Sequence, residues 1–115
     1  MIENSIEVCA FADRFRVLVR DWQLDAYELA LLLGQPETWE MPPSFASLPA
    51  NVETRMRLLL QLDDLLRVGL RGMGVADWLR SGFDGMEIPP LVFLSLGIEE
   101  TRAMRDAARM RISAE

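Results

Sequence analysis

The chain has no histidine and only one cysteine, Cys9, among its 115 residues. Without histidine it lacks the usual general base, the partner of Ser–His and Cys–His nucleophile pairs, and the commonest metal ligand. A single cysteine forms neither an internal disulfide nor a cysteine-based metal cluster. We therefore expect no catalytic residues, no cofactor and no metal site, which argues against an enzyme.

Lysine is also absent, so all 12 basic residues are arginines, and the 18 acidic residues give a net charge of -6. Residues 1–50 hold three arginines against eight acids, a net charge of -5. This half repels a phosphate backbone, because nucleic-acid binding depends on clustered positive charge. Arginine used without lysine suits fixed, planar contacts with the carboxylates of a partner.

Long hydrophobic runs are missing as well. The longest, such as residues 29–33 and 58–60, are far too short to span a bilayer. Half of the chain is nevertheless apolar, which is enough for one core in a single domain of this length. The first residues are acidic before they are apolar, unlike a secretory signal. We expect a cytoplasmic protein with no membrane contact.

An apolar stripe near the start of the chain predicts a helix over residues 5–21. Its members recur at spacings of three and four residues, as one side of a helix requires: Val8, Phe11, Phe15, Leu18 and Trp22. The stripe is large for one small core to cover. We therefore expect part of it to pair with a second copy in a twofold homodimer.

A short helix with clear end signals follows. Asp25 and Glu28 match a capping box, and Gly34 is placed to end the helix in a left-handed conformation. This predicts a helix over 26–33 and the first half of a helix-turn-helix.

The second half of that motif is interrupted. Residues 36–50 contain four of the six prolines, and Pro42 and Pro43 stop a helix that starts near Glu37. The segment is expected to be a stiff, irregular connector with room for one helical turn. A major groove is read by a regular helix, so we expect weak DNA binding, or binding only as part of a larger complex.

The longest predicted helix runs over residues 52–71, with Asn51 as its N-cap. Its apolar side is broad, which indicates a central helix packed from more than one side. Leu59, Leu62 and Leu66 are expected to be almost fully buried. Arg55 is the one charged residue inside the apolar arc.

Glycine and proline then divide the chain into shorter helices. We expect them over residues 75–81, 91–96 and 99–110, with a turn at 85–90. The predicted fold is all-α, a compact bundle of six or seven helices. Residues 1–50 form a degenerate helix-turn-helix-like part, and residues 51–115 form a helical C-terminal part of the same unit.

Four pieces in this order resemble antitoxins of the Xre/MbcA/ParS type, which carry a toxin-binding domain. They are the WQLDAYELALLLG segment at 22–34, the helix at 55–66, ADWL at 76–79, and a glycine-proline turn followed by Leu91, Leu94 and Gly97. The resemblance covers roughly residues 15–110, and its most specific part is Trp-Leu followed by that turn.

The resemblance implies an antitoxin that neutralises a RES-domain toxin, an NAD-consuming enzyme, by covering its active site. Two other classes stay open: a DNA-binding repressor that regulates its own promoter, and a non-enzymatic helical adaptor.

The closing helix and tail are expected to supply the main inhibitory contact, as is common in this family. Arg102, Arg105 and Arg109 recur at spacings of three and four, so they share one helix face. The tail brings the Glu115 carboxylate, which resembles the phosphates that an NAD pocket receives. The expected toxin-binding residues are Trp78, Arg102, Arg105, Arg109, Arg111, Ile112, Ser113 and Glu115.

Overall fold

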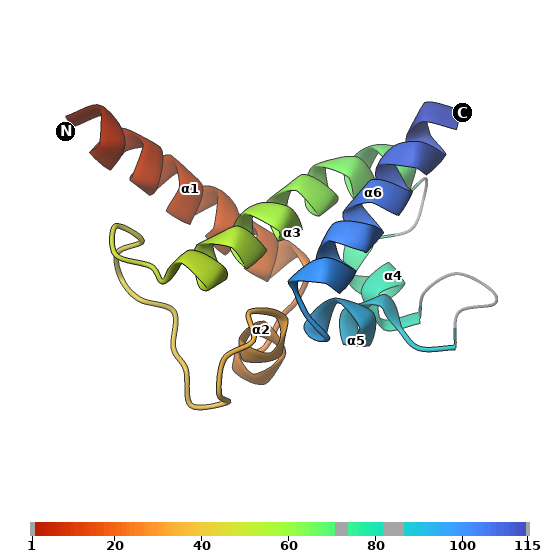
Figure 1. Ribbon diagram of the computed structural model, residues 1–115, viewed down its shortest axis with the longest axis horizontal. Helices are drawn as coiled ribbons and strands as arrows, with labels where there is room; N and C mark the ends of the chain where they lie inside the picture. Colours follow the sequence, from red (N-terminus) through yellow and green to blue (C-terminus); the bar gives the residue numbers. More distant parts are fainter. Residues whose placement is uncertain (1, 71–73, 82–86, 115) are drawn as a thin grey trace.

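The computed structural model describes the backbone of residues 2–70, 74–81 and 87–114, and side chains within 8–70, 74–81 and 87–111. In these ranges all regular structure is helical, as the sequence predicts (Figure 1). The helices are α1 (Ile2–Asp21), α2 (Ala26–Leu32), α3 (Ala50–Gly69), α4 (Val75–Ser81), α5 (Pro90–Ser95) and α6 (Ile98–Ala114).

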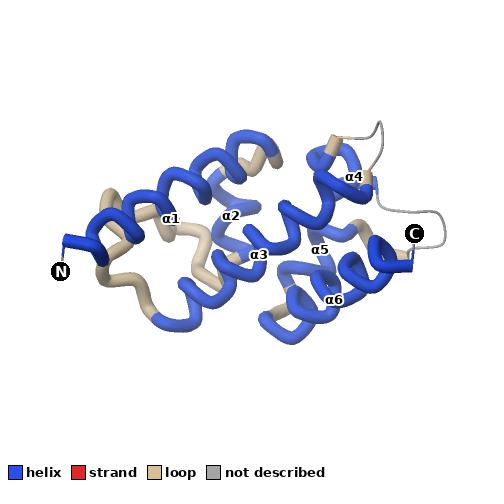
Figure 2. The backbone as a smooth tube through the Cα atoms, turned by 90° about the horizontal axis from the view of Figure 1, so that it is seen from above, coloured by secondary structure: helices blue, strands red, loops and turns tan. Residues whose placement is uncertain are grey.

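Helix α3 is the central element, as expected from its broad apolar side. It contacts α1, α4 and α6, and in Figure 2 it runs diagonally between α1 and α2 on one side and α5 and α6 on the other. Leu59, Leu62 and Leu66 are buried, which confirms the prediction. Leu60 is also buried, on the side where α1 crosses α3.

The expected N-cap of α3 is wrong. The helix begins at Ala50 with Pro49 in the cap position, and no side chain caps it. Pro49 has a φ of -56° and a ψ of 144°, so its ring already sets an extended entry into the first turn. Asn51 lies one position inside the helix, where its side chain has lost the geometry of a cap.

The apolar stripe of α1 is covered by the same chain. Phe11, Phe15, Leu18 and Trp22 are all buried in one core cluster. The connector folds back to place Phe45 against α1, with its ring centroid 5.5 Å from that of Phe11 in an edge-to-face arrangement. The reason given for a homodimer, an uncovered stripe, is therefore wrong, and self-association stays a prediction without that support.

The end signals of α2 act as predicted. The Asp25 side chain accepts a hydrogen bond from the Glu28 amide at 2.7 Å, and Glu28 Oε1 accepts one from the Asp25 amide at 3.1 Å. Gly34 has a φ of +67°. Residues 33–49 then contain no helix, only isolated turns such as the one closed by the Trp39 amide on the Pro36 carbonyl at 2.8 Å. An irregular connector therefore occupies the position of a recognition helix.

Both halves of the chain contribute to one core. The cluster of buried residues includes Trp22 and Leu32 from the first part, and Leu59, Trp78 and Leu94 from the second. The boundary at residue 50 stays a prediction, because the core does not separate there.

Candidate protein-binding surfaces

Helix α6 is fixed to the body by its first half. Thr101 is buried, and its hydroxyl donates to the Gly97 carbonyl at 2.8 Å and lies 3.1 Å from the Leu94 carbonyl, which ties α6 to α5. Arg105 Nη1 donates to Gln61 Oε1 on α3 at 2.7 Å. Met104 and Ala108 pack against the core.

The second half of α6 is largely exposed. From Asp106 to Arg111 the described side chains are exposed, except the half-buried Ala108. Met110 is 73% exposed, the highest value among the exposed large hydrophobic residues of the described chain. Its chain neighbours Arg109 and Arg111 are exposed too, so this end of the helix presents an apolar side chain and two cations to solvent.

The structure divides the predicted arginine face. Arg102 pairs with Glu99 at 2.9 Å, and Arg105 pairs with Asp106 at 2.8 Å. The Arg105 side chain is only 17% exposed, because it lies against α3. Arg109 and Arg111 remain exposed. The side chains of Ile112 and Ser113, and Glu115 altogether, lie outside the described residues.

Trp78 does not belong to a surface. It is 1% exposed and forms part of the core cluster together with Leu79. Its burial contradicts a direct contact between Trp78 and a partner. The α4 helix has only seven residues, and an isolated helix of that length is unstable in water. Packing of Trp78 and Leu79 in the core therefore holds it in place.

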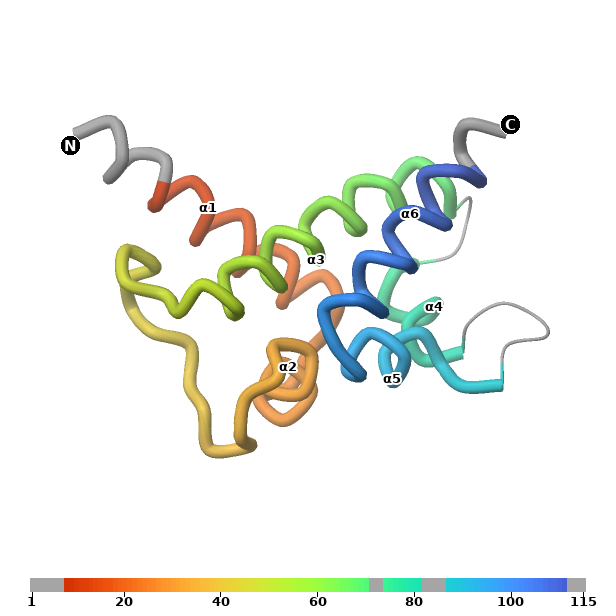
Figure 3. The backbone as a smooth tube through the Cα atoms, viewed as in Figure 1, coloured from red at the N-terminus to blue at the C-terminus, as the bar shows by residue number. Residues whose placement is uncertain are grey.

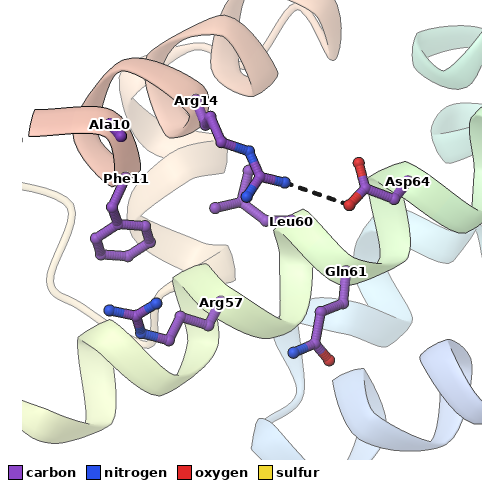
Figure 4. A pocket seen from close by; sticks show the side chains of 7 residues that line it. All are labelled: Ala10, Phe11, Arg14, Arg57, Leu60, Gln61 and Asp64. Carbon is purple, nitrogen blue, oxygen red and sulfur yellow. Dashed lines mark hydrogen bonds and ion pairs between the residues drawn. The ribbon is translucent and has the colours of Figure 1, made fainter. Parts of the chain in front are cut away.

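A groove between α1 and α3 holds a cavity of about 320 Å³ (Figure 4). On its walls, Arg14 Nη2 lies 3.2 Å from Asp64 Oδ2, and the Arg57 guanidinium lies 4.3 Å from the centroid of the Phe11 ring. Arg57 also pairs with Glu53 at 3.3 Å. Both arginines are therefore already paired with neighbouring acids, and the groove carries charges of both signs.

A buried carboxylate lies beside this groove. Asp63 Oδ1 accepts a hydrogen bond from Trp22 Nε1 at 2.8 Å, and Oδ2 accepts one from Arg67 Nε at 2.8 Å. Arg67 Nη2 also donates to Asp21 Oδ2 at 2.7 Å. The hydrogen bond from Arg67 lowers the pKa of Asp21, and bonding to Asp63 and Asp21 raises the pKa of Arg67. Each Asp63 oxygen therefore accepts a hydrogen bond from a side chain of the same fold, which links α3 to the end of α1.

Arg80 joins three helices. Its guanidinium donates to the carbonyls of Trp22 at 3.0 Å and Gln23 at 2.8 Å, which follow the end of α1. It also donates to the Ala76 carbonyl and pairs with Glu28 at 3.0 Å. Gln23 has a strained φ of +55°, and the hydrogen bond from Arg80 to its carbonyl stabilises this conformation.

Arg55 has a similar role at the end of α2. Its Nη1 lies 3.4 Å from the Leu32 carbonyl, and a Cβ added at Gly34 would lie 2.7 Å from its Cζ. The composition predicts arginines that contact the carboxylates of a partner, whereas the side chains of Arg55, Arg67 and Arg80 bind groups of the chain itself. The one sequence signal was the position of Arg55 inside an apolar arc.

Known proteins add no further assignment: no protein-family model, curated protein or solved structure matches the chain. In the described ranges no group of three or more Cys, Asp or Glu side chains is arranged to hold a metal ion. None of the helices there has the length and apolar character needed to cross a bilayer.

Proposed function

We propose that this chain is a cytoplasmic antitoxin that binds and neutralises a RES-type, NAD-consuming toxin and performs no chemistry itself. The observation that carries the proposal is the exposed end of α6, where Met110 is 73% exposed between Arg109 and Arg111. Methionine and arginine are enriched where proteins bind one another. The identity of the partner comes from the resemblance of residues 15–110 to Xre/MbcA/ParS-type antitoxins.

The shape of α6 supports a contact that covers a cavity. Its first half is held by Thr101 and Arg105, so the exposed half projects from a fixed base. A preformed helix loses little conformational freedom on binding. Arg109 and Arg111 then meet acidic groups on the rim of the toxin site, which sets association rate and register more than affinity.

The helix-turn-helix alternative is not favoured by the local structure. The connector after Gly34 has no helix to lie in a major groove, and the first half of the chain is acidic. We expect the isolated protein to bind DNA weakly at physiological salt. A toxin complex would present several copies at once and could bind by avidity.

The proposal is tested by protection of cells that express the cognate toxin from the adjacent reading frame. Deleting residues 111–115, or changing Met110→Asp, should abolish or strongly reduce protection and co-purification. Arg20→Ala is the matched control, because Arg20 is also an exposed arginine but lies on α1. Circular dichroism checks that each variant keeps its helices. Full protection by both the truncated chain and Met110→Asp would refute the α6 contact.

A further inference from the structure

Exposed apolar side chains gather on two short helices. Eight large hydrophobic residues are exposed in the described part of the chain, and five of them lie on α2, on α5 or on the residues directly before and after α5. These five, the α2–α5 face, are Tyr27, Leu31, Ile88, Val92 and Leu96. Helices α2 and α5 contact each other, and both lie below α3 in Figure 3.

The α2–α5 face consists of apolar residues of these helices that are not buried in the core. Helix α2 buries Leu29, Ala30 and Leu32, and α5 buries Pro90 and Leu94. The exposed large apolar residues are spaced by four, Tyr27 with Leu31 on α2 and Val92 on α5 with the C-cap Leu96, so each pair lies on one side of its helix. Single exposed hydrophobic residues are ordinary, whereas a gathering on adjacent helices marks an interaction surface.

The two segments that form the face carry charge of one sign. Residues 23–37 and 87–101 contain six acids and no arginine. Two of the acids are paired with arginines from outside these segments, Glu28 with Arg80 and Glu99 with Arg102. The others are Asp25, Glu37, Glu87 and Glu100. Arg80 and Arg55 reach α2 from other helices, so the acids of the two segments outnumber the arginines that contact them, and the net charge beside the face is negative.

We propose that the α2–α5 face binds a protein surface with an apolar centre and a rim of lysine or arginine. Charge complementarity selects this occupant. A second copy would bring acids against acids, and anionic lipids and nucleic acids would be repelled in the same way. The face is separate from the exposed end of α6, so this inference does not depend on the identity of the toxin.

The test uses the full chain and two synthetic amphipathic helical peptides, one of leucine and lysine and one of leucine and glutamate. We expect the leucine–lysine peptide to shift the backbone amide resonances of α2 and α5, with binding that weakens as salt rises. The Leu31→Ser/Leu96→Ser variant should bind it on the order of tenfold more weakly. Val17→Ser, an exposed hydrophobic position on α1, is the control and should bind as the parent does.

Several outcomes would overturn the inference. They are equal binding of both peptides, unchanged binding by Leu31→Ser/Leu96→Ser, and shifts confined to α1, α3 or α6. A dimer in sedimentation that Leu31→Ser/Leu96→Ser dissociates would show that a second copy is the occupant. Deleting residues 111–115 should leave peptide binding unchanged, which separates this test from that of the α6 contact.

Discussion

Two sets of apolar residues with similar helical spacing differ in solvent exposure in this protein. On α1 and directly after it, Phe11, Phe15, Leu18 and Trp22 are at most 7% exposed. On α2, on α5 and at the C-cap of α5, Tyr27, Leu31, Val92 and Leu96 are at least 40% exposed. The α1 stripe is covered by α3 and by Phe45 from the connector. In the described chain no element lies over the other stripe in the same way. Periodicity thus shows that a helix has an apolar side, but not what covers that side.

The largest difference between the two stripes should appear in stability. Phe15→Ala removes a fully buried ring and should lower the free energy of unfolding by about 3–5 kcal/mol. Leu96→Ala on the α2–α5 face should change it by less than about 0.5 kcal/mol. Urea denaturation followed by circular dichroism measures both. Similar losses in the two variants would mean that the α2–α5 face is part of the core.

Arg67 tests how much the polar contacts beside the buried α1 stripe contribute to stability. Arg67→Met leaves the buried Asp63 carboxylate with only the hydrogen bond from Trp22. Arg67 is about half exposed, so water replaces part of the lost contact, and the expected loss is about 1–3 kcal/mol. Arg20→Met, at a more exposed arginine, should have almost no effect in the same denaturation experiment.

Gly34 tests the boundary between α2 and the connector that covers α1. Gly34→Ala places a Cβ at a φ of +67° and within 2.7 Å of Arg55, so it should cost about 1–2 kcal/mol for the left-handed conformation, with a further cost from displacing the guanidinium. In Gly34→Ala/Arg55→Ala the guanidinium is absent, so the added methyl no longer displaces it and only the cost of the left-handed conformation remains. A double-mutant cycle with Arg55→Ala measures the coupling, and strict additivity would contradict the contact.

The smallest effect concerns pH. Hydrogen bonding from Arg67 lowers the pKa of Asp21 below its ordinary value of 3.8. The contribution of ionised Asp21 to stability is therefore complete above the pKa that Asp21 has in the unfolded chain. It is lost as the pH falls through the lower pKa of Asp21 in the folded chain. Asp21→Asn should reduce stability by less than about 1 kcal/mol at pH 7, because the pair is partly exposed, and the difference should disappear in strong acid. A difference that grows with acidity would contradict the sign.

The sequence predicted the fold class and much of the helix layout because those signals act locally. The helix ends at Asp25 and Gly34 and the break at Pro42 and Pro43 depend on residues within about one turn of each other. The burial of Leu59, Leu62 and Leu66 follows from their shared side of a long helix. The start of α3 was less predictable, because Pro49 sets the entry geometry in place of a capping Asn51.

The candidate surfaces were less accessible to sequence reasoning. Arg109 and Arg111 are exposed as expected, whereas Trp78 is buried and Arg105 turns toward Gln61 on α3. Each of these outcomes depends on a residue far away in the chain. The α2–α5 face was missed because the sequence marks these helices as apolar without showing which of their sides meets the core.

The sequence by itself determined that this chain is helical, where most of its helices begin and end, and that its charge is acidic and its cations all arginine. Tertiary structure alone decided which apolar stripe is buried and which arginines bind the chain itself. The physical reason is range: capping, proline and periodicity act over a few residues. Phe45 reaches α1, Arg67 reaches Asp21 and Arg80 reaches Trp22 across 30 to 58 residues, through a fold that must already exist.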